Sequence, residues 1–258
     1  MQNRLLGKLK AGAKPMGAFC SLGGTAAVEA MALGGLDYVI IDNEHGPQDI
    51  ESSVAGILAA ESRGITPFLR PRGHDRAAIL KALDNGAQGL VVPYVRSIEE
   101  VLALVERAKY RPVGDRGFAG VRANGFGLAP FAADIRAYFR LMNEQTLLLP
   151  QCETRACLDD IEKIVALPGV DGAFVGPYDL SISLDVPGDL DSKTLLDAAQ
   201  RVQKACADAG KYSFIYAGSA AKARQFFEMG YDSVAAGLDV QILANGVAGI
   251  VKAVKGEA

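Results

Sequence analysis

The chain has 258 residues, of which 50% are hydrophobic and 22% charged, and its formal net charge is −3. This is the size of one (β/α)8 barrel and leaves ample material for a buried core. The absence of a basic cluster argues against nucleic acid as a partner, and no apolar run approaches the length of a membrane span. The four cysteines lack metal-type spacing and the first residues lack a secretory core, so a cytoplasmic protein is expected.

Eight short, β-rich apolar runs recur along the chain and are predicted to be strands. In order they are Gly17–Phe19, Tyr38–Ile41, Thr66–Leu69, Gly89–Val92, Leu147–Leu149, Ala173–Val175, Ser213–Ile215 and Ser233–Ala236. Segments with helical periodicity lie between or after them: Ile50–Ser62, Ala77–Asn85, Ile98–Lys109, Phe131–Leu141, Leu158–Leu167, Leu195–Ala209, Ala220–Met229 and Val240–Val254. Such alternation indicates a parallel sheet with right-handed crossovers, and eight repeats close naturally into a barrel. We therefore predict an α/β fold, a (β/α)8 TIM barrel, as a single domain over residues 1–258.

One connection is much longer than the others. Residues 111–127 are rich in glycine and include Arg111, Arg116 and Arg122. A long loop in a compact domain is usually functional or mobile. Arg72 and Arg116 could serve either the surface or a substrate.

Polar side chains follow several of the predicted strands, where barrel enzymes place their active sites. They are Asp42, Glu44 and His45 after the second strand, Arg70 after the third, Gln151 and Glu153 after the fifth, and Gly176, Pro177 and Asp179 after the sixth. Carboxylates suit Mg²⁺ or Mn²⁺, arginine suits a carboxylate or enolate oxygen, and histidine is a base near neutral pH. Together they suit proton abstraction beside a carbonyl or retro-aldol cleavage through an enolate.

Four of these motifs carry a specific resemblance. Residues 174–184, Phe-Val-Gly-Pro-Tyr-Asp-Leu-Ser-Ile-Ser-Leu, resemble the Gly-Pro-x-Asp-Leu-Ser-x-Ser-Leu signature of the HpcH/HpaI aldolase family. The segments at residues 42–47, 69–71 and 151–153 are similar to that family's other motifs, in the same order. The resemblance implies a (β/α)8 barrel of the phosphoenolpyruvate/pyruvate superfamily type. It also implies a homo-oligomer, a hexamer or trimer, with the C-terminal helix exchanged between subunits.

The resemblance also implies an activity and assigns roles. The enzyme would be a class II aldolase that cleaves a 4-hydroxy-2-oxo acid to pyruvate, or a related 2-oxo acid, and an aldehyde through a metal-stabilised enolate. Glu153 and Asp179 would bind Mg²⁺, Mn²⁺ or Co²⁺, with no organic cofactor. The remaining expected roles are His45 as base with Asp42 as its partner, Arg70 as the pyruvate clamp, and Gln151, Gly176 and Pro177 as substrate contacts. Glu44 is expected to support the metal indirectly, and Asp84 to approach a neighbouring subunit's site.

Simpler interpretations exist for each feature. His45 could be a surface histidine, Arg70 a structural ion pair, and Glu153 and Asp179 ordinary helix-start residues, while His74 is expected to cap a helix or lie in a solvated loop. A Schiff-base aldolase would need a lysine at a strand end, and the lysines fall in predicted helices or before a strand. Two other functions stay open: a lyase acting on a dicarboxylic or CoA-linked substrate, and a non-catalytic 2-oxo-acid-binding barrel. The acceptor aldehyde is not specified by the sequence.

Overall fold

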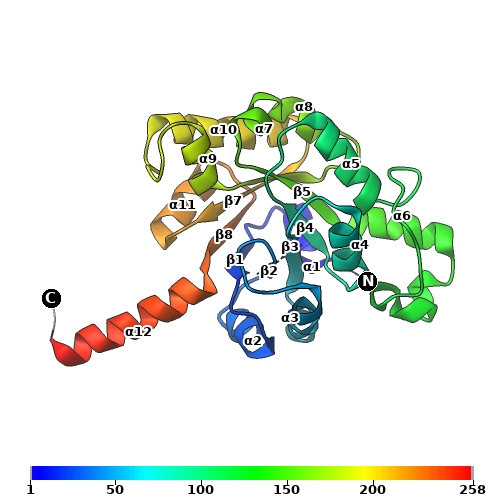
Figure 1. The fold of residues 1–258 in the computed structure, drawn as a ribbon, viewed down its shortest axis with the longest axis horizontal. Helices are drawn as coiled ribbons and strands as arrows, with labels where there is room; N and C mark the ends of the chain where they lie inside the picture. Colours follow the sequence, from blue (N-terminus) through cyan, green and yellow to red (C-terminus); the bar gives the residue numbers. More distant parts are fainter. Residues whose placement is uncertain (1, 257–258) are drawn as a thin grey trace.

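The computed structural model describes residues 2–256, and its centre is a closed barrel of eight parallel strands in sequential order (Figure 1). The strands are β1 (Met16–Cys20), β2 (Tyr38–Asp42), β3 (Thr66–Arg70), β4 (Gly89–Val92), β5 (Leu147–Cys152), β6 (Gly172–Val175), β7 (Tyr212–Ala217) and β8 (Ser233–Leu238). All eight predicted strands are confirmed, with boundaries that differ by a few residues at most. The predicted TIM-barrel class is therefore confirmed.

Twelve helices are found in the described residues, most of them around the outside of the barrel (Figure 1). They are α1 (Arg4–Lys10), α2 (Thr25–Leu33), α3 (Ile50–Arg63), α4 (Arg76–Asp84), α5 (Ile98–Ala108), α6 (Ile135–Gln145), α7 (Arg155–Asp159), α8 (Ile161–Ala166), α9 (Pro177–Ser183), α10 (Lys193–Asp208), α11 (Ala220–Glu228) and α12 (Asp239–Lys255). Two short 3₁₀ turns, Arg122–Gly127 and Pro130–Ala132, lie before α6.

Two predicted helices need correction. The segment predicted over Leu158–Leu167 is two helices, α7 and α8, which meet at Asp160, where φ is −105° and ψ is 14°. The helix predicted over Phe131–Leu141 begins only at Ile135, because the side chain of Asp134 accepts hydrogen bonds from the next turn and caps it there. The helices α1, α2 and α9 were not predicted as helical segments.

The barrel interior is filled with large apolar side chains. Phe19, Phe68, Phe174 and Phe214 belong to one buried cluster, which also includes Leu5 of α1. The main-chain amide of Leu5 donates to the hydroxyl of Thr66, the first residue of β3, at 3.1 Å. Helix α1 therefore packs against the amino-terminal end of the barrel, and the opposite end remains for a site.

The long loop is held to the body of the protein by two ion pairs. The guanidinium of Arg116 is paired with Asp84 at 2.7 Å and stacks on the ring of Tyr110 at 4.6 Å. Arg122 is paired with Glu61. Arg116 and Arg122 thus anchor the loop to α4 and α3, and Arg116 has a structural role in this chain.

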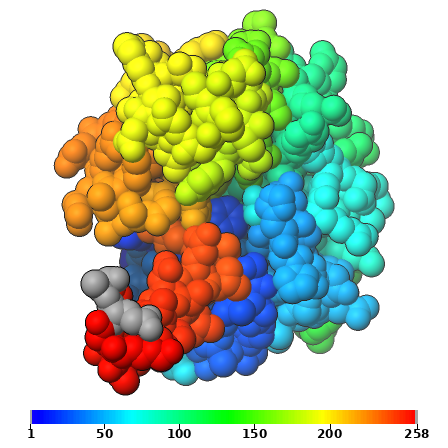
Figure 2. All heavy atoms as spheres, turned by 60° about the vertical axis from the view of Figure 1, so that its left-hand side comes forward, coloured from blue at the N-terminus to red at the C-terminus, as the bar shows by residue number. Residues whose placement is uncertain are grey.

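The last helix leaves the barrel and projects away from it (Figure 1; red in Figure 2). Residues 241–256 are all exposed, including the apolar side chains of Ile242, Leu243, Ile250 and Val254. In residues 2–256 there is no helix whose length and apolar character would let it cross a membrane.

Candidate active site

Two cavities open at the carboxyl ends of the strands. The inner cavity has a volume of about 320 Å³, and among the residues that line it are Asp42, His45, Arg70, Gln151, Gly176, Pro177 and Asp179. The outer cavity, of about 490 Å³, is lined by residues that include Glu44, His45, Tyr94, Glu153 and Asp179. His45 and Asp179 line both, so the two cavities meet there. The structure thus brings together every predicted site residue except Asp84.

Arg70 and Asp42 form the buried base of the inner cavity. They are direct partners in the register of β3 and β2. The Arg70 Nε and Nη2 groups donate to the two oxygens of Asp42 at 2.8 and 2.7 Å, a bidentate pair. The guanidinium also lies 4.7 Å from the centre of the Phe19 ring. Both predicted features of Arg70, ion pair and cavity position, are therefore present.

The expected contact between Asp42 and the imidazole of His45 is not formed. The carboxylate of Asp42 accepts the main-chain amides of Glu44 and His45, at 3.1 and 3.4 Å, in addition to its bonds with Arg70. The carboxylate nearest the imidazole is instead Glu44, at 3.8 Å, and 69% of the His45 side chain is exposed. Asp42 therefore shapes the loop that carries His45 rather than orienting its ring.

Glu44 lies between these groups. Its Oε2 atom is 3.0 Å from Nη1 of Arg70 in an ion pair that lacks hydrogen-bond geometry. Burial raises the pKa of Glu44, and the charge of Arg70 opposes that rise. Glu44 thus adds a second negative group beside Arg70.

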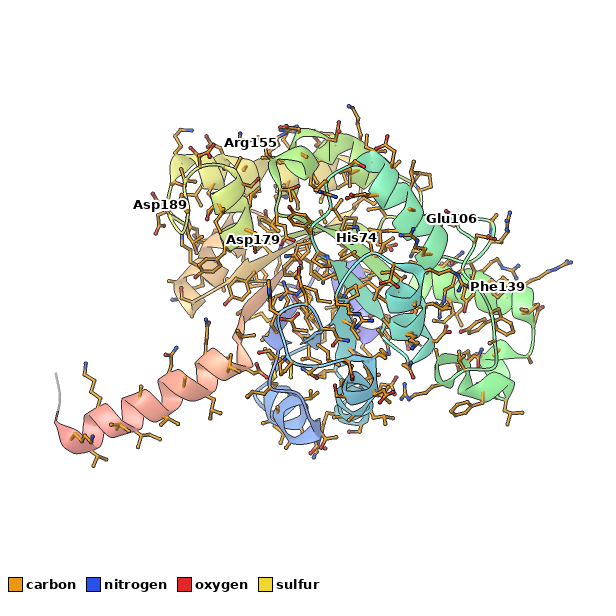
Figure 3. All side chains as sticks on the ribbon, in the orientation of Figure 1. His74, Glu106, Phe139, Arg155, Asp179 and Asp189 are labelled. Carbon is orange, nitrogen blue, oxygen red and sulfur yellow. The ribbon has the colours of Figure 1, made fainter. Side chains whose placement is uncertain are left out.

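Glu153 is held by two donors. The main-chain amide of Tyr94 donates to Oε1 at 2.5 Å, and the side-chain amide of Gln151 donates to Oε2. Burial raises the pKa of Glu153 to about 7, the neighbouring charges of Asp179 and Glu44 add to the rise, and the two donors oppose it. Asp179, in the first turn of α9, is by contrast exposed; in Figure 3 it lies nearer the middle of the molecule than Asp189, which follows α9.

Gly176 is required by space. A Cβ atom at this position would lie 2.7 Å from both Gln151 Nε2 and Glu153 Oε2. Pro177 follows as the first residue of α9, where a missing amide proton costs nothing. The Gly-Pro pair therefore lets the end of β6 approach Gln151 and Glu153 closely while it starts the helix that carries Asp179.

The donor set fits a divalent cation with an open coordination shell. Four carboxylates, of Asp42, Glu44, Glu153 and Asp179, line the two cavities together with Arg70, and only two of them are paired with it, so a cation would offset negative charge there. No group of three or more His, Cys, Asp or Glu side chains arranged for a metal occurs among residues 2–256. Glu153 and Asp179 would thus supply two oxygens, and water or substrate the others.

Several lining residues were not predicted. Tyr94 follows β4, a strand end at which the sequence predicts no site residue, and its main-chain role has no sequence signal. Phe19 and Phe174 were not predicted either; with Tyr216, from the predicted end of the seventh strand, they form an aromatic wall of the inner cavity, with ring centres 5.8 Å apart for Phe19 and each of the others. Their positions at strand ends could have indicated them.

Asp84 and the lysines lie elsewhere in the described chain. Asp84 ends α4 and is paired with Arg116, away from both cavities. No lysine is among the lining residues of either cavity within residues 2–256. Lys109, the buried one, is bonded to Asp171 at 2.7 Å and to two carbonyl groups.

The fold and site define a class of protein: a (β/α)8-barrel enzyme with an arginine, a histidine and paired carboxylates at the strand ends. The sequence profile described as HpcH/HpaI aldolase/citrate lyase matches residues 16–246, and the chain belongs to this family of carbon–carbon bond-cleaving enzymes. A pyruvate aldolase of Rhizobium etli is 34% identical over 95% of this chain and 94% of its own length. A hydroxypyruvate/pyruvate aldolase of Chromohalobacter salexigens is 34% identical over 89% of each chain. The crystal structure of an HpcH/HpaI aldolase from Desulfitobacterium hafniense superposes with a TM-score of 0.91, at 29% identity, over 97% of this chain and 96% of that one.

Proposed function

We propose that this enzyme reversibly cleaves a 4-hydroxy-2-oxo acid into pyruvate, or a closely related 2-oxo acid, and an aldehyde. The observation that carries the proposal is the convergence of Arg70, Gln151, Glu153 and Asp179 on two adjoining cavities that share His45. Relatives named as pyruvate and hydroxypyruvate/pyruvate aldolases, similar over nearly the whole chain, support it.

In this proposal each residue has a distinct task. Arg70 and the backbone near Gly176 and Pro177 bind the carboxylate and 2-oxo group of the donor, and Gln151 contacts it from the same cavity. His45 removes the proton from the hydroxyl of the substrate as the carbon–carbon bond breaks, and delivers a proton to the donor carbon that the aldehyde leaves, which becomes the pyruvate methyl group. In the reverse direction it takes a methyl proton and returns one to the aldehyde oxygen. The high exposure of its ring keeps it accessible from both cavities.

Glu153 and Asp179 are the proposed ligands of a divalent cation, Mg²⁺, Mn²⁺ or Co²⁺. When bound, such an ion would polarise the 2-oxo group and offset the negative charge that develops as the bond breaks. Glu44, which lies close to Arg70, is proposed to support the bound cation indirectly and not to be one of its ligands.

Metal removal and one variant test the proposal. Retro-aldol activity, followed by the release of pyruvate from a series of 4-hydroxy-2-oxo acids, should vanish on exhaustive chelation and return with added Mn²⁺. His45→Ala should lose exchange of the pyruvate methyl protons with solvent while it still binds Mn²⁺. Activity that persists in a metal-free sample would disprove the metal role, and unchanged proton exchange in His45→Ala would disprove the base.

We further propose that α12 of a second copy covers an apolar cavity of this chain, in a homo-oligomer. A cavity of about 490 Å³ lies between α2 and the start of α12, lined by residues that include Ala27, Ala30, Met31 and Ile242. The exposed apolar face of α12 continues beyond it, and isolated helices with such faces are rarely left in water. Asp84 is proposed to approach the site of a neighbouring subunit in that assembly.

The oligomer can be tested by mass in solution. Ile250→Arg should weaken assembly in light-scattering measurements, whereas Lys252→Glu, a charge change on the same helix, should leave it intact. A monomeric wild-type protein would refute the proposal.

The four free, buried cysteines support the cytoplasm as its compartment, and we propose that the chain functions as one barrel domain.

A further inference from the structure

We propose that Tyr94 is a positioning residue for Glu153, through its main-chain amide rather than its side chain. The inference rests on the proposed cation site, because it concerns the orientation of one of the two proposed ligands. Tyr94 lies in the irregular segment that follows β4, and nothing in its side chain marks it for this role.

The two hydrogen bonds that Glu153 accepts fix the orientation of its carboxylate. The amide of Tyr94 bonds Oε1 and the amide of Gln151 bonds Oε2, so a donor holds each oxygen from the protein side. An ionised carboxylate oxygen can accept two hydrogen bonds or ligands. One acceptor direction on each oxygen therefore remains for a cation, and the carboxylate is oriented before any cation binds.

The backbone of Tyr94 is strained in a manner that serves this contact. Its φ angle is +53°, in the left-handed region that glycine and asparagine tolerate and that bulky residues avoid. Such a conformation persists only where the surroundings enforce it, and it occurs frequently at functional sites. The side chain does not enforce it, since 58% of Tyr94 is exposed.

The surroundings that enforce it come from two other strand ends. The carbonyl of Pro93, on one side, contacts the imidazole Nε2 of His74, which follows β3. On the other side, the carbonyl of Val95 accepts the hydroxyl of Thr154 at 2.7 Å, and the Val95 side chain is fully buried. Three consecutive residues are thus tied down, with the Tyr94 amide aimed at Glu153. This also corrects the expectation for His74, which contacts the carbonyl of Pro93 in this segment, while Asp75 caps α4.

Three substitutions at position 94 separate main chain from side chain, with the dissociation constant of Mn²⁺ measured by electron paramagnetic resonance. Tyr94→Gly and Tyr94→Asn accept the left-handed conformation and should bind Mn²⁺ within about threefold of wild type. Tyr94→Val resists it and should bind about 10- to 100-fold more weakly, the usual effect of losing a group that orients a metal ligand.

Phe126→Val is the matched control. Phe126 is another exposed aromatic residue with positive φ, +58°, and its amide donates to the carbonyl of Val121 rather than to the site. Its substitution should destabilise the protein comparably to Tyr94→Val but leave the Mn²⁺ affinity unchanged. Equal losses of affinity in the two valine variants would overturn the inference, as would wild-type affinity in Tyr94→Val. Equal losses in all three position-94 variants would assign the effect to the side chain and also overturn it.

A second measurement needs no metal. Hydrogen exchange of the residue-94 amide, followed by mass spectrometry with residue-level fragmentation, should be slow in the metal-free protein and at least tenfold faster in Glu153→Ala. It should be unchanged in Asp179→Asn, which alters the other proposed ligand. If the wild-type protein binds no Mn²⁺, the proposed cation site is wrong. Slow exchange of the residue-94 amide would still support the hydrogen bond from Tyr94 to Glu153. Fast exchange would overturn the proposed role of Tyr94.

Discussion

Replacing Gly176 by alanine should disrupt the site with a single methyl group. The added Cβ would lie 2.7 Å from both Gln151 Nε2 and Glu153 Oε2, whereas ordinary contacts begin at 3.4 Å. Each atom must therefore retreat by about 0.7 Å (3.4 − 2.7 = 0.7). Because these two side chains are bonded to each other, and Glu153 also to Tyr94, any retreat changes the geometry of the hydrogen bonds that hold Glu153.

The size of the effect follows from this crowding. Overpacking a buried position costs about 1–3 kcal/mol, which for a chain of this size lowers Tm by roughly 2–12 °C. Displacing an oriented ligand by a fraction of an ångström should weaken Mn²⁺ binding by about tenfold or more.

Calorimetry of the metal-free protein and Mn²⁺ titration test both effects. Gly73→Ala is the matched control, because Gly73 lies in a strand-end loop where an added methyl group would meet nothing within 4 Å, and its φ is not positive. Its Tm and affinity should stay close to wild type. If Gly176→Ala also behaves like wild type in both measurements, the close approach of β6 to Gln151 and Glu153 is not what excludes a side chain there.

Three further predictions concern buried groups and the lining of the cavities. Arg70→Met leaves the carboxylate of Asp42 buried without its partner, and it should lower the free energy of unfolding in urea by about 3–5 kcal/mol. Adding Asp42→Asn to this variant should cost less than Asp42→Asn costs in the wild-type protein. Strictly additive losses of stability would contradict the pairing. Burial raises the pKa of Cys20 and Cys206 to about 12, so at pH 8 roughly one thiol in ten thousand is ionised, and a disulfide reagent should label them only as the protein opens. Since these thiols ionise near pH 9 when unfolded, they should also make stability fall as pH rises above 9, a slope that Cys206→Ala should reduce. Borohydride reduction with pyruvate should leave no adduct in the mass spectrum, because neither cavity has a lysine in its lining within residues 2–256, and a stable adduct would instead establish Schiff-base chemistry.

The barrel could be predicted from local patterns because its elements are locally encoded. A run such as Tyr38–Ile41 is apolar and β-branched over the length of one strand, and it is buried on both faces, as parallel strands are. Gly64 and Gly210 lie just after predicted helices, where glycine favours a left-handed end, and their φ angles are 74° and 65°. The strand-end rule then indicated the carboxylates, together with His45 and Arg70, in the lining of the two cavities.

Contacts between elements were not predictable in the same way. The partner of Asp42 is decided by the register of β2 against β3, which places Arg70 beside it, and not by its spacing of three positions from His45.

Helix ends were also missed. The break at Asp160 between α7 and α8, and the late start of α6, depend on local geometry and capping that hydrophobic periodicity does not reveal.

By itself, therefore, the sequence determined the barrel, its family and the chemical types gathered at the strand ends, since strand length, alternation and motif order are properties of neighbouring residues. Only the tertiary structure decided how these groups are held. It pairs Arg70 with Asp42, buries Glu153 so that its pKa rises to about 7, and aims the amide of Tyr94 at that carboxylate. The physical reason is that burial, register and backbone strain arise between segments far apart in the chain. The order of residues in the sequence does not give the distances between those segments.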